Sequence, residues 1–235
     1  MNRVPSAQDS ARLIKPTFEE TLASLREHYQ RPVIGWSYNK VRNASRPIFS
    51  GDMTAAAIAG MFTAPAHEDA RSPKAIGRKS NLQVAVMLRD HASGRVFKCH
   101  DLKPRKVFLS PEHALTVNPG FYFVEDGKVK IFWLQPRRTY ALTIEQMGVL
   151  NGLLRLSHFR DDFEDAELEL LDLSAVDGVR VPQVFGRADL PVLTEEQLRV
   201  GLEHLLRAYL TLKDIDLKPP RAAKEPPPAE PDLFT

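Results

Sequence analysis

The segment of residues 121–134 constrains the fold of this chain more strongly than any other. Two runs rich in aromatic and β-branched residues flank the dipeptide Asp126-Gly127. This dipeptide accommodates the positive φ angles of a type I′ turn, so the segment predicts a β-hairpin with strands over residues 121–125 and 128–134. Apolar residues lie on both faces of the second strand, which predicts a central strand that is covered on both sides.

Capping boxes mark the start of three helices. Thr17, Thr143 and Thr194 each stand three residues before a Glu or a Gln, and in a capping box these two side chains satisfy backbone amides of the first helical turn. Apolar residues repeat at helical spacing after each box. The sequence therefore predicts helices over residues 17–29 and 143–157 and a third one beginning at Thr194.

Two further regions are interpreted as strands. Residues 84–89 and 95–101 flank a short turn at residues 91–94 and indicate a second hairpin, and residues 167–173 indicate one more strand. The order helix, hairpin, hairpin, helix, strand, helix predicts an α+β fold, an α/β sandwich. Its mixed β-sheet would have about five strands flanked by helices.

The chain of 235 residues fits one large domain with appendages. Residues 1–80 are expected to form the N-terminal helix and a basic, partly irregular segment, with a short helix near residue 55 and an exposed basic loop over residues 71–79. Residues 81–217 are expected to form the α/β core. Residues 218–235 hold six prolines and no apolar periodicity, which predicts a disordered tail.

The charge of the chain is divided unevenly along its length. Residues 1–110 hold 18 Lys and Arg and 9 Asp and Glu, a charge of +9, whereas residues 111–235 hold 14 and 21, a charge of −7. The small net charge of +2 therefore combines a basic half, suited to a polyanion, with an acidic half.

Several classes of protein are disfavoured by the composition. A single cysteine excludes a disulfide framework, and the histidines are scattered without metal-ligand spacing. No apolar run approaches the roughly 18 residues of a transmembrane helix, and the polar N-terminus lacks the apolar region of a secretory signal. These features predict a cytoplasmic protein.

The predicted order of elements resembles the αβββαβ core of the PD-(D/E)XK nuclease superfamily. Residues 118–137 are similar to its motif in length, hairpin and hydrophobic pattern. The resemblance implies a sheet face on which an Asp and a Glu hold magnesium and a Lys activates water. These three positions fall on Gly120, Gln135 and Arg137, so the metal ligands and the lysine are missing.

The degenerate motif predicts a nucleic-acid-associated protein that binds DNA without cleaving it and needs no cofactor. Its setting would be bacterial DNA metabolism, defence or mobile-element biology. One alternative is an accessory subunit of a larger complex without nucleic-acid contact. A second is an active magnesium-dependent nuclease whose motif has migrated, with Asn118 or Glu112 as a substitute ligand.

The neighbours of Gln135 discriminate between these readings. Two carboxylates there would indicate catalysis, whereas arginine and apolar groups would indicate a binding or structural face. A further Asp-x-Lys pattern, Asp90 with Asp101-Leu102-Lys103, is set aside because the predicted register separates the two carboxylates by about 20 Å.

Three basic clusters are separated by predicted strands and are candidates for a phosphate-binding groove. Solvated loops that the acidic half balances are the alternative. The candidate nucleic-acid-binding residues are Arg71, Lys74, Arg78, Lys79, Lys103, Arg105, Lys106, Arg137 and Arg138.

The C-terminal residues Asp232, Leu233 and Phe234 suggest a partner-binding motif at the tip of the tail. They resemble the end of the bacterial sliding-clamp-binding peptide, although Glu230 stands where that peptide has Gln. A sliding clamp or another protein is therefore a candidate partner. A frayed terminus without function is the alternative.

Other candidate chemistry is weaker. Cys99 precedes His100, but adjacent residues of a strand point to opposite faces, so they are not expected to form a nucleophile and base pair. The acidic run at residues 161–165 is interpreted as a solvated turn, with a cation site or a basic partner's docking point as the minor reading.

Overall fold

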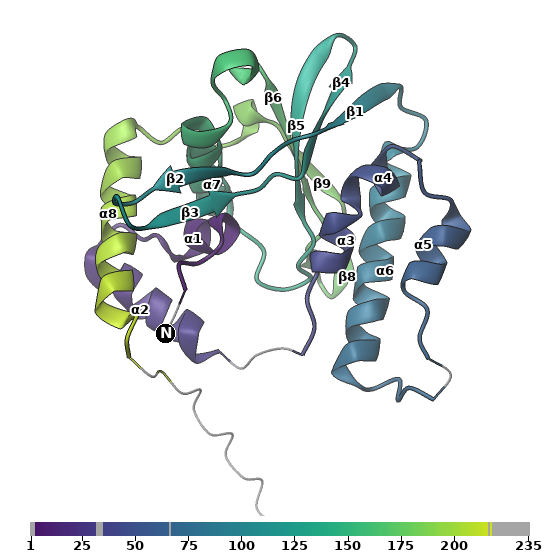
Figure 1. Ribbon diagram of the computed structural model, residues 1–235, viewed down its shortest axis with the longest axis horizontal. Helices are drawn as coiled ribbons and strands as arrows, with labels where there is room; N and C mark the ends of the chain where they lie inside the picture. Colours follow the sequence, from purple (N-terminus) through teal and green to yellow (C-terminus); the bar gives the residue numbers. More distant parts are fainter. Residues whose placement is uncertain (1–2, 32–34, 66, 216, 218–235) are drawn as a thin grey trace, which may run out of the picture.

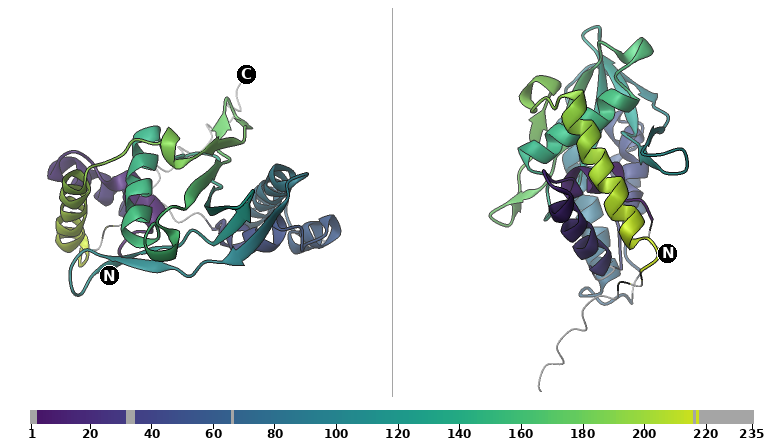
Figure 2. Two further views of the ribbon diagram at one scale, coloured as in Figure 1. Left: turned by 90° about the horizontal axis from the view of Figure 1, so that it is seen from above. Right: turned by 90° about the vertical axis from the view of Figure 1, so that its left-hand side faces the viewer.

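A five-stranded mixed sheet forms the centre of the molecule, with helices on both faces (Figures 1 and 2). The computed structural model describes residues 3–31, 35–65, 67–215 and 217. The sheet has the strand order β1-β4-β5-β6-β9, with bounds Phe97–Asp101, Phe121–Glu125, Lys128–Gln135, Glu167–Asp172 and Gln183–Phe185. The expected α+β sandwich is therefore confirmed.

Each face of the sheet has its own apolar core. The first core lies under α1, α2, α7 and α8, which span Ala7–Leu13, Phe18–Gln30, Ile144–Ser157 and Glu195–Leu212. The second lies under α3, α4, α5 and α6, which span Asn39–Asn43, Ser45–Phe49, Ala55–Met61 and Pro73–Ala92. Two layers of helices thus enclose the sheet.

Small elements complete the described chain. A ribbon of β2 and β3, Arg105–Phe108 and Ala114–Val117, extends toward α8 (Figure 1), and β7 and β8 form a second ribbon over Ala175–Val176 and Val179–Arg180. Single 3-10 turns, η1 and η2, lie at Asp161–Phe163 and Arg187–Asp189.

The central hairpin forms as the sequence predicts. β4 and β5 pair antiparallel from Glu125 opposite Lys128, and Asp126 and Gly127 at the turn have φ angles of 51° and 75°. β5 lies between β4 and β6, and its alternate side chains enter the two cores. After β5, α7 returns the chain so that β6 runs parallel to β5.

The three predicted capping boxes are all present, at the starts of α2, α7 and α8. With α6 as the first helix, the elements α6, β1, β4, β5, α7 and β6 follow one another in the order αβββαβ, with the β2–β3 ribbon inserted before β4. Within the described residues, no helix is both long and apolar enough to cross a bilayer.

The predicted hairpin over residues 84–101 is wrong in its first half. Residues 84–89 belong to the 20-residue helix α6, which also contains most of the expected basic loop and crosses the boundary expected at residue 80. Val84, Ala85 and Leu88 all face the second core, a helical spacing that the β-branched residues obscured. Ser72 caps this helix and Pro73 occupies its first turn, where a missing amide costs nothing.

Gly148 in α7 allows a close approach between segments. A Cβ atom on it would lie 2.8 Å from the Pro191 carbonyl oxygen before α8, so this glycine packs against that segment rather than against the sheet.

We expect Gly148→Ala to lower the free energy of unfolding by about 1–3 kcal/mol, measured by urea denaturation. Gly60→Ala, also in a helix but with nothing within 4 Å, should be neutral or stabilising by up to about 1 kcal/mol. Equal effects of the two substitutions would contradict this packing argument.

Candidate functional site

The degenerate motif converges on the end of β5, where helices approach from both faces of the sheet. Gln135 is the last residue of this strand and is fully buried. Its Oε1 accepts hydrogen bonds from Gln8 Nε2 on α1 and from the backbone N–H of Arg137. On the other side of Gln8, Arg42 of α3 donates a hydrogen bond to Gln8 Oε1. A chain of polar groups therefore connects α3, α1 and β5.

The polarity of this chain follows from Arg42. A guanidinium can only donate, so it orients the carbonyl oxygen of Gln8 toward itself and the Gln8 amide nitrogen toward Gln135. Gln135 must then present its oxygen to Gln8. Its Nε2 is left as a buried donor without an acceptor among the described residues, as is Arg42 Nε.

Two further guanidinium groups share one carboxylate beside this chain. Arg137 lies 2.6 Å from Asp9 Oδ1, and Arg12 lies 3.4 Å from the same oxygen. Arg42, by contrast, forms no ion pair within the described part of the chain and donates to Gln8 instead. We call Arg12, Arg42 and Arg137, together with Gln8, Asp9 and Gln135, the arginine cluster.

The charges of the arginine cluster perturb one another. Burial, assisted by the neighbouring charge of Arg137, lowers the pKa of both Arg12 and Arg42 to about 10. Burial alone would raise the pKa of Asp9, but the hydrogen bond and charge of Arg137 outweigh it, so the pKa of Asp9 is lowered. Arg12, Arg42 and Asp9 are therefore ionised near neutral pH, and together with the guanidinium of Arg137 they leave positive charge in excess.

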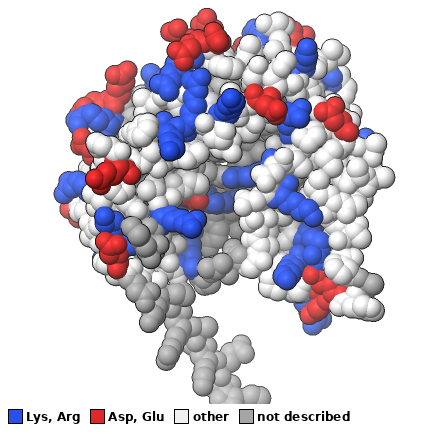
Figure 3. Space-filling model, viewed as in Figure 1, with Lys and Arg blue, Asp and Glu red and all other residues white. Residues whose placement is uncertain are grey.

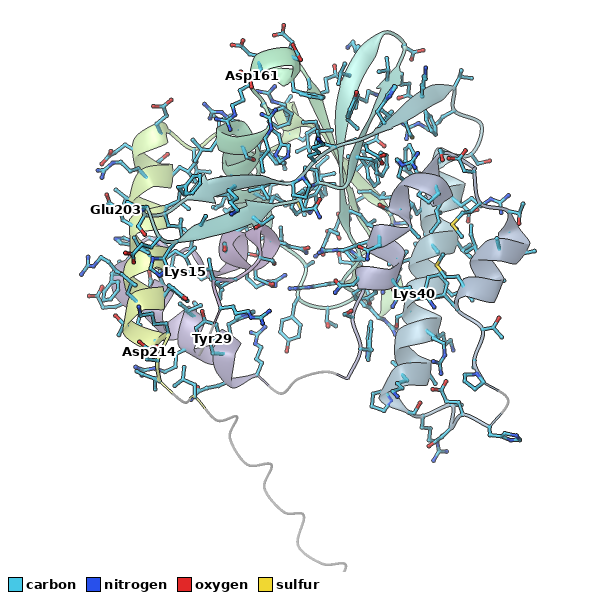
Figure 4. All side chains as sticks on the ribbon, viewed as in Figure 1. Lys15, Tyr29, Lys40, Asp161, Glu203 and Asp214 are labelled. Carbon is cyan, nitrogen blue, oxygen red and sulfur yellow. The ribbon has the colours of Figure 1, made fainter. Side chains whose placement is uncertain are left out.

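The surface above this region is basic and hollowed. Figure 3 shows Lys and Arg side chains gathered around a hollow between the part of the molecule that holds α1 and α2 and the part that holds α3. Lys40, labelled in Figure 4, does not belong to the arginine cluster, because its ammonium donates to the Met61 carbonyl and lies over the Phe62 ring.

Carboxylates do not replace the missing motif. Asp172 pairs with Gln135 in the parallel ladder, but it accepts hydrogen bonds from the backbone and hydroxyl of Ser174, and burial raises its pKa. Asn118 and Glu112, the proposed substitute ligands, are exposed, and Glu112 lies in the turn of the β2–β3 ribbon. In the portion of the chain that the structure describes, no group of three potential metal ligands occurs.

Gly120 departs from the predicted geometry. The ladder between β4 and β5 ends at Phe121 opposite Phe132, and Gly120 precedes it with a φ angle of 107°. A Cβ atom on Gly120 would lie 3.7 Å from Ser45 Oγ at the start of α4. The glycine therefore makes a bend beside α4 and lies outside the β4–β5 ladder, so it does not occupy the sheet face that the resemblance implies.

The predicted basic residues lie on three separate elements. The first turns of α6 carry Lys74, Arg78 and Lys79, and Arg71 just precedes this helix. The strand β2 carries Arg105 and Lys106, and Lys103 lies just before it. The strand β5 is followed by Arg137 and Arg138. The exposed ones are Arg71, Lys74, Lys79, Lys103, Lys106 and Arg138.

Besides Arg137, three of these basic residues have partners within the protein. Arg78 pairs with Glu68, Arg105 lies 3.6 Å from Asp161, and Arg138 donates to the Gly178 carbonyl. The exposed lysines and Arg71 are the groups best placed for an external ligand.

Sequence reasoning missed Gln8, Arg12 and Arg42. α1 is only seven residues long, and its start is marked by the single cap Ser6. Arg42 is separated from Gln8 by 34 residues, and Gln8 from Gln135 by 127. No local pattern reports contacts of this separation.

A second ionic cluster lies near the hairpin turn, at the other end of the sheet. Arg95 donates to both oxygens of Glu125 and of Glu169 at 2.7–2.8 Å, and Lys130 and His91 each add one contact at 2.8 Å. The hydrogen bond from Arg95 is the largest of the causes that lower the pKa of Glu125 to about 2. Because each of these carboxylates is matched by cations, this cluster is structural.

The remaining candidate groups offer little chemistry. Cys99 packs against the second core while His100 stacks on Tyr122, so the two point to opposite faces as predicted, and burial raises the pKa of Cys99 to about 11. Asp161 opens η1 near Arg105. The predicted partner motif at residues 232–234 lies outside the described residues.

A groove of about 760 Å³ lies outside the arginine cluster. It is lined by apolar and polar side chains from the α1–α2 connection, the start of α7 and the start of α8, and Ile14, Val149 and Val200 are among the apolar ones. Lys15, labelled in Figure 4, also lines it.

The comparisons with known proteins identify no relative: no family model matches the chain, and neither a curated protein nor a solved structure is significantly similar to it.

Proposed function

We propose that this protein binds nucleic acid through the basic face around the arginine cluster and does not cleave it. The observation that carries this proposal is the chemistry at Gln135. Its side-chain oxygen accepts from the Gln8 amide and the Arg137 backbone N–H, Arg42 donates to Gln8, and the carboxylate of its ladder partner Asp172 is already bonded to Ser174. Magnesium prefers carboxylate oxygens and water, and the one side-chain oxygen of Gln135 already accepts two hydrogen bonds. Guanidinium groups are suited to phosphate.

Exposed basic residues on two other elements are candidates for the same interface. Lys103 lies in the connection from β1 to β2, and Lys106 lies on β2. Lys74 and Lys79 lie at the start of α6. Exposed lysines of this kind neutralise backbone phosphates without reading the sequence of bases. We therefore expect binding with little dependence on base sequence.

Binding should weaken steeply with salt. Fluorescence anisotropy with labelled single-stranded and duplex DNA should give a linear fall of log K with log salt, with a slope of about −0.7 to −0.9 per phosphate contacted, because counterions are released on binding. The variant Lys103→Ala/Lys106→Ala should bind several-fold more weakly at about 0.1 M salt and show a shallower slope.

A charge-matched control separates this effect from net charge. Lys128→Ala/Arg199→Ala also removes two positive charges, at side chains that are 66% and 58% exposed beside the hairpin turn and on α8, and it should change affinity less than about twofold. If the wild-type protein fails to bind any nucleic acid even at low salt, the proposal is wrong and the accessory-subunit function is favoured.

Catalysis is tested separately. Plasmid and single-stranded DNA incubated with magnesium or manganese should remain intact, because Asp172 beside Gln135 is bonded to Ser174 and no group of three potential metal ligands occurs among the described residues. Metal-dependent cleavage that co-purifies with the protein and persists in a Gln135→Ala/Arg137→Ala variant would place a catalytic site elsewhere in the chain.

A further inference from the structure

We propose that the arginine cluster is a receptor for a terminal phosphate, so that the protein prefers nucleic-acid ends that carry a phosphomonoester. This inference rests on the nucleic-acid binding proposed above and names the part of the ligand that enters the cluster. Three features of the cluster carry it: donors without acceptors, an excess of positive charge and depth.

The first feature is the pair of unsatisfied donors. Gln135 Nε2 and Arg42 Nε are buried and lack an acceptor among the described residues. The direction of the hydrogen bonds from Arg42 through Gln8 leaves a donor at the free end of the chain. A buried donor without a partner is unfavourable, so the cluster favours a ligand that supplies acceptors only. A phosphate is such a ligand.

The second feature is charge. Arg12 and Arg137 share Asp9, whereas Arg42 has no ion pair within the described residues, so three guanidiniums face one carboxylate. This leaves an excess of two positive charges. A phosphomonoester carries about −1.5 to −2 near pH 7, close to that excess. An internal phosphodiester carries only one negative charge.

The third feature is depth. Gln135 and Gln8 are 0% and 1% exposed, and the side chains of Arg12 and Asp9 are each 13% exposed. An internal phosphodiester has a nucleoside on each side and cannot enter a recess without carrying both with it. A terminal phosphate is attached through one ester bond, so it can reach a largely buried guanidinium such as that of Arg12.

The test compares three oligonucleotides of one sequence that carry a 5′-phosphate, a 3′-phosphate or hydroxyls at both ends, each with an internal fluorophore. One phosphorylated form should bind roughly 10-fold or more tightly than the hydroxyl form, as expected for charged hydrogen bonds of about 1.5–3 kcal/mol. Equal affinity for all three, with salt-dependent binding retained, would overturn this inference and leave the proposed function standing. Absence of binding to all three would overturn both.

Two substitutions with opposite expected effects make the test specific. Arg42→Gln should bring the ratio between the phosphorylated and hydroxyl forms close to one. Asp9→Asn keeps the shape of the side chain but removes the competing carboxylate, so it should increase the ratio. If Arg42→Gln does not fold, as judged by thermal melting, the decision rests on Asp9→Asn, for which a decreased ratio contradicts the inference.

Competition identifies the source of the phosphate. Inorganic phosphate at millimolar concentration should reduce the preference for the phosphorylated end while leaving binding of the hydroxyl form unchanged, because the exposed lysines would not depend on the cluster. A nucleoside monophosphate that binds as tightly as the phosphorylated oligonucleotide would show that the ligand is a free nucleotide, which would overturn the assignment to a nucleic-acid end.

Discussion

Replacing Arg95 with methionine is expected to lower the free energy of unfolding by about 3–5 kcal/mol, the usual cost of removing one partner from a buried ionic network. The guanidinium lies between Glu125 and Glu169, whose side chains are only 13% and 8% exposed. It also covers the rings of Phe49 and Phe123. Without it, two carboxylates would face each other with only Lys130 and His91 as partners. Urea denaturation monitored by circular dichroism measures the loss.

The effect should depend on pH in a defined direction. Hydrogen bonds from Arg95 lower the pKa of Glu125 from 4.5 to about 2. Burial raises the pKa of Glu169, but hydrogen bonds from His91 and Arg95 outweigh burial, so the pKa of Glu169 is also lowered. A lowered pKa contributes stability above the unfolded value near 4.5, and this contribution is lost as the pH falls toward 2. The difference between wild type and Arg95→Met should therefore shrink from about pH 6 to about pH 3.

A compensated variant controls for lost packing. Arg95→Met/Glu125→Gln/Glu169→Gln removes the arginine together with both carboxylates and leaves only Lys130 and His91 of the cluster. It should recover most of the stability that Arg95→Met loses, because replacing buried ionic partners together costs far less than leaving carboxylates unpaired. A triple variant as unstable as Arg95→Met would show that the packing of the arginine over the aromatic rings, and not its charge, carries the effect.

Local signals in the sequence predict much of this fold. Asp126-Gly127 specifies a turn through its own backbone preferences, and each capping box satisfies its own helix start, so these elements follow from a few adjacent residues. The prediction failed at residues 84–89, where a β-branched run was interpreted as a strand although it continues a helix that Ser72 caps. Packing of Val84 against the sheet from within a helix overrides the strand preference of its side chain.

The candidate site is only half predictable for the same reason. Gln135 and Arg137 directly follow the predicted hairpin, so their place at the end of β5 can be predicted from the sequence alone. Arg42 and Gln8 reach the site from α3 and α1, which belong to opposite layers of helices. Their convergence depends on how both layers pack on the sheet, and no spacing in the sequence encodes it.

Phe49→Ala is expected to cost about 3–5 kcal/mol of unfolding free energy, the usual range for emptying a buried phenylalanine site. Phe49 is the last residue of α4 and is 1% exposed. It contacts four aromatic rings of the sheet, those of Phe97, Phe121, Phe123 and Phe132. Its ring centroid lies 4.7 Å from that of Phe97 and 4.8 Å from that of Phe132. Removing it opens a cavity between the sheet and the second helical layer, which urea denaturation should report as a lower midpoint with a similar slope.

Matched substitutions separate this core effect from the loss of a phenylalanine as such. Phe49→Leu keeps most of the volume and should cost less than about half as much as Phe49→Ala, because the remaining void is smaller. Phe108→Ala removes the same atoms from a side chain on β2 that is 67% exposed, and its effect should stay within about 0.5 kcal/mol. Comparable losses for Phe49→Ala and Phe108→Ala would mean that the aromatic cluster under α4 does not hold the second helical layer on the sheet. In that case Arg42, which α3 carries in the same layer, would have no rigid support for its position beside Gln8.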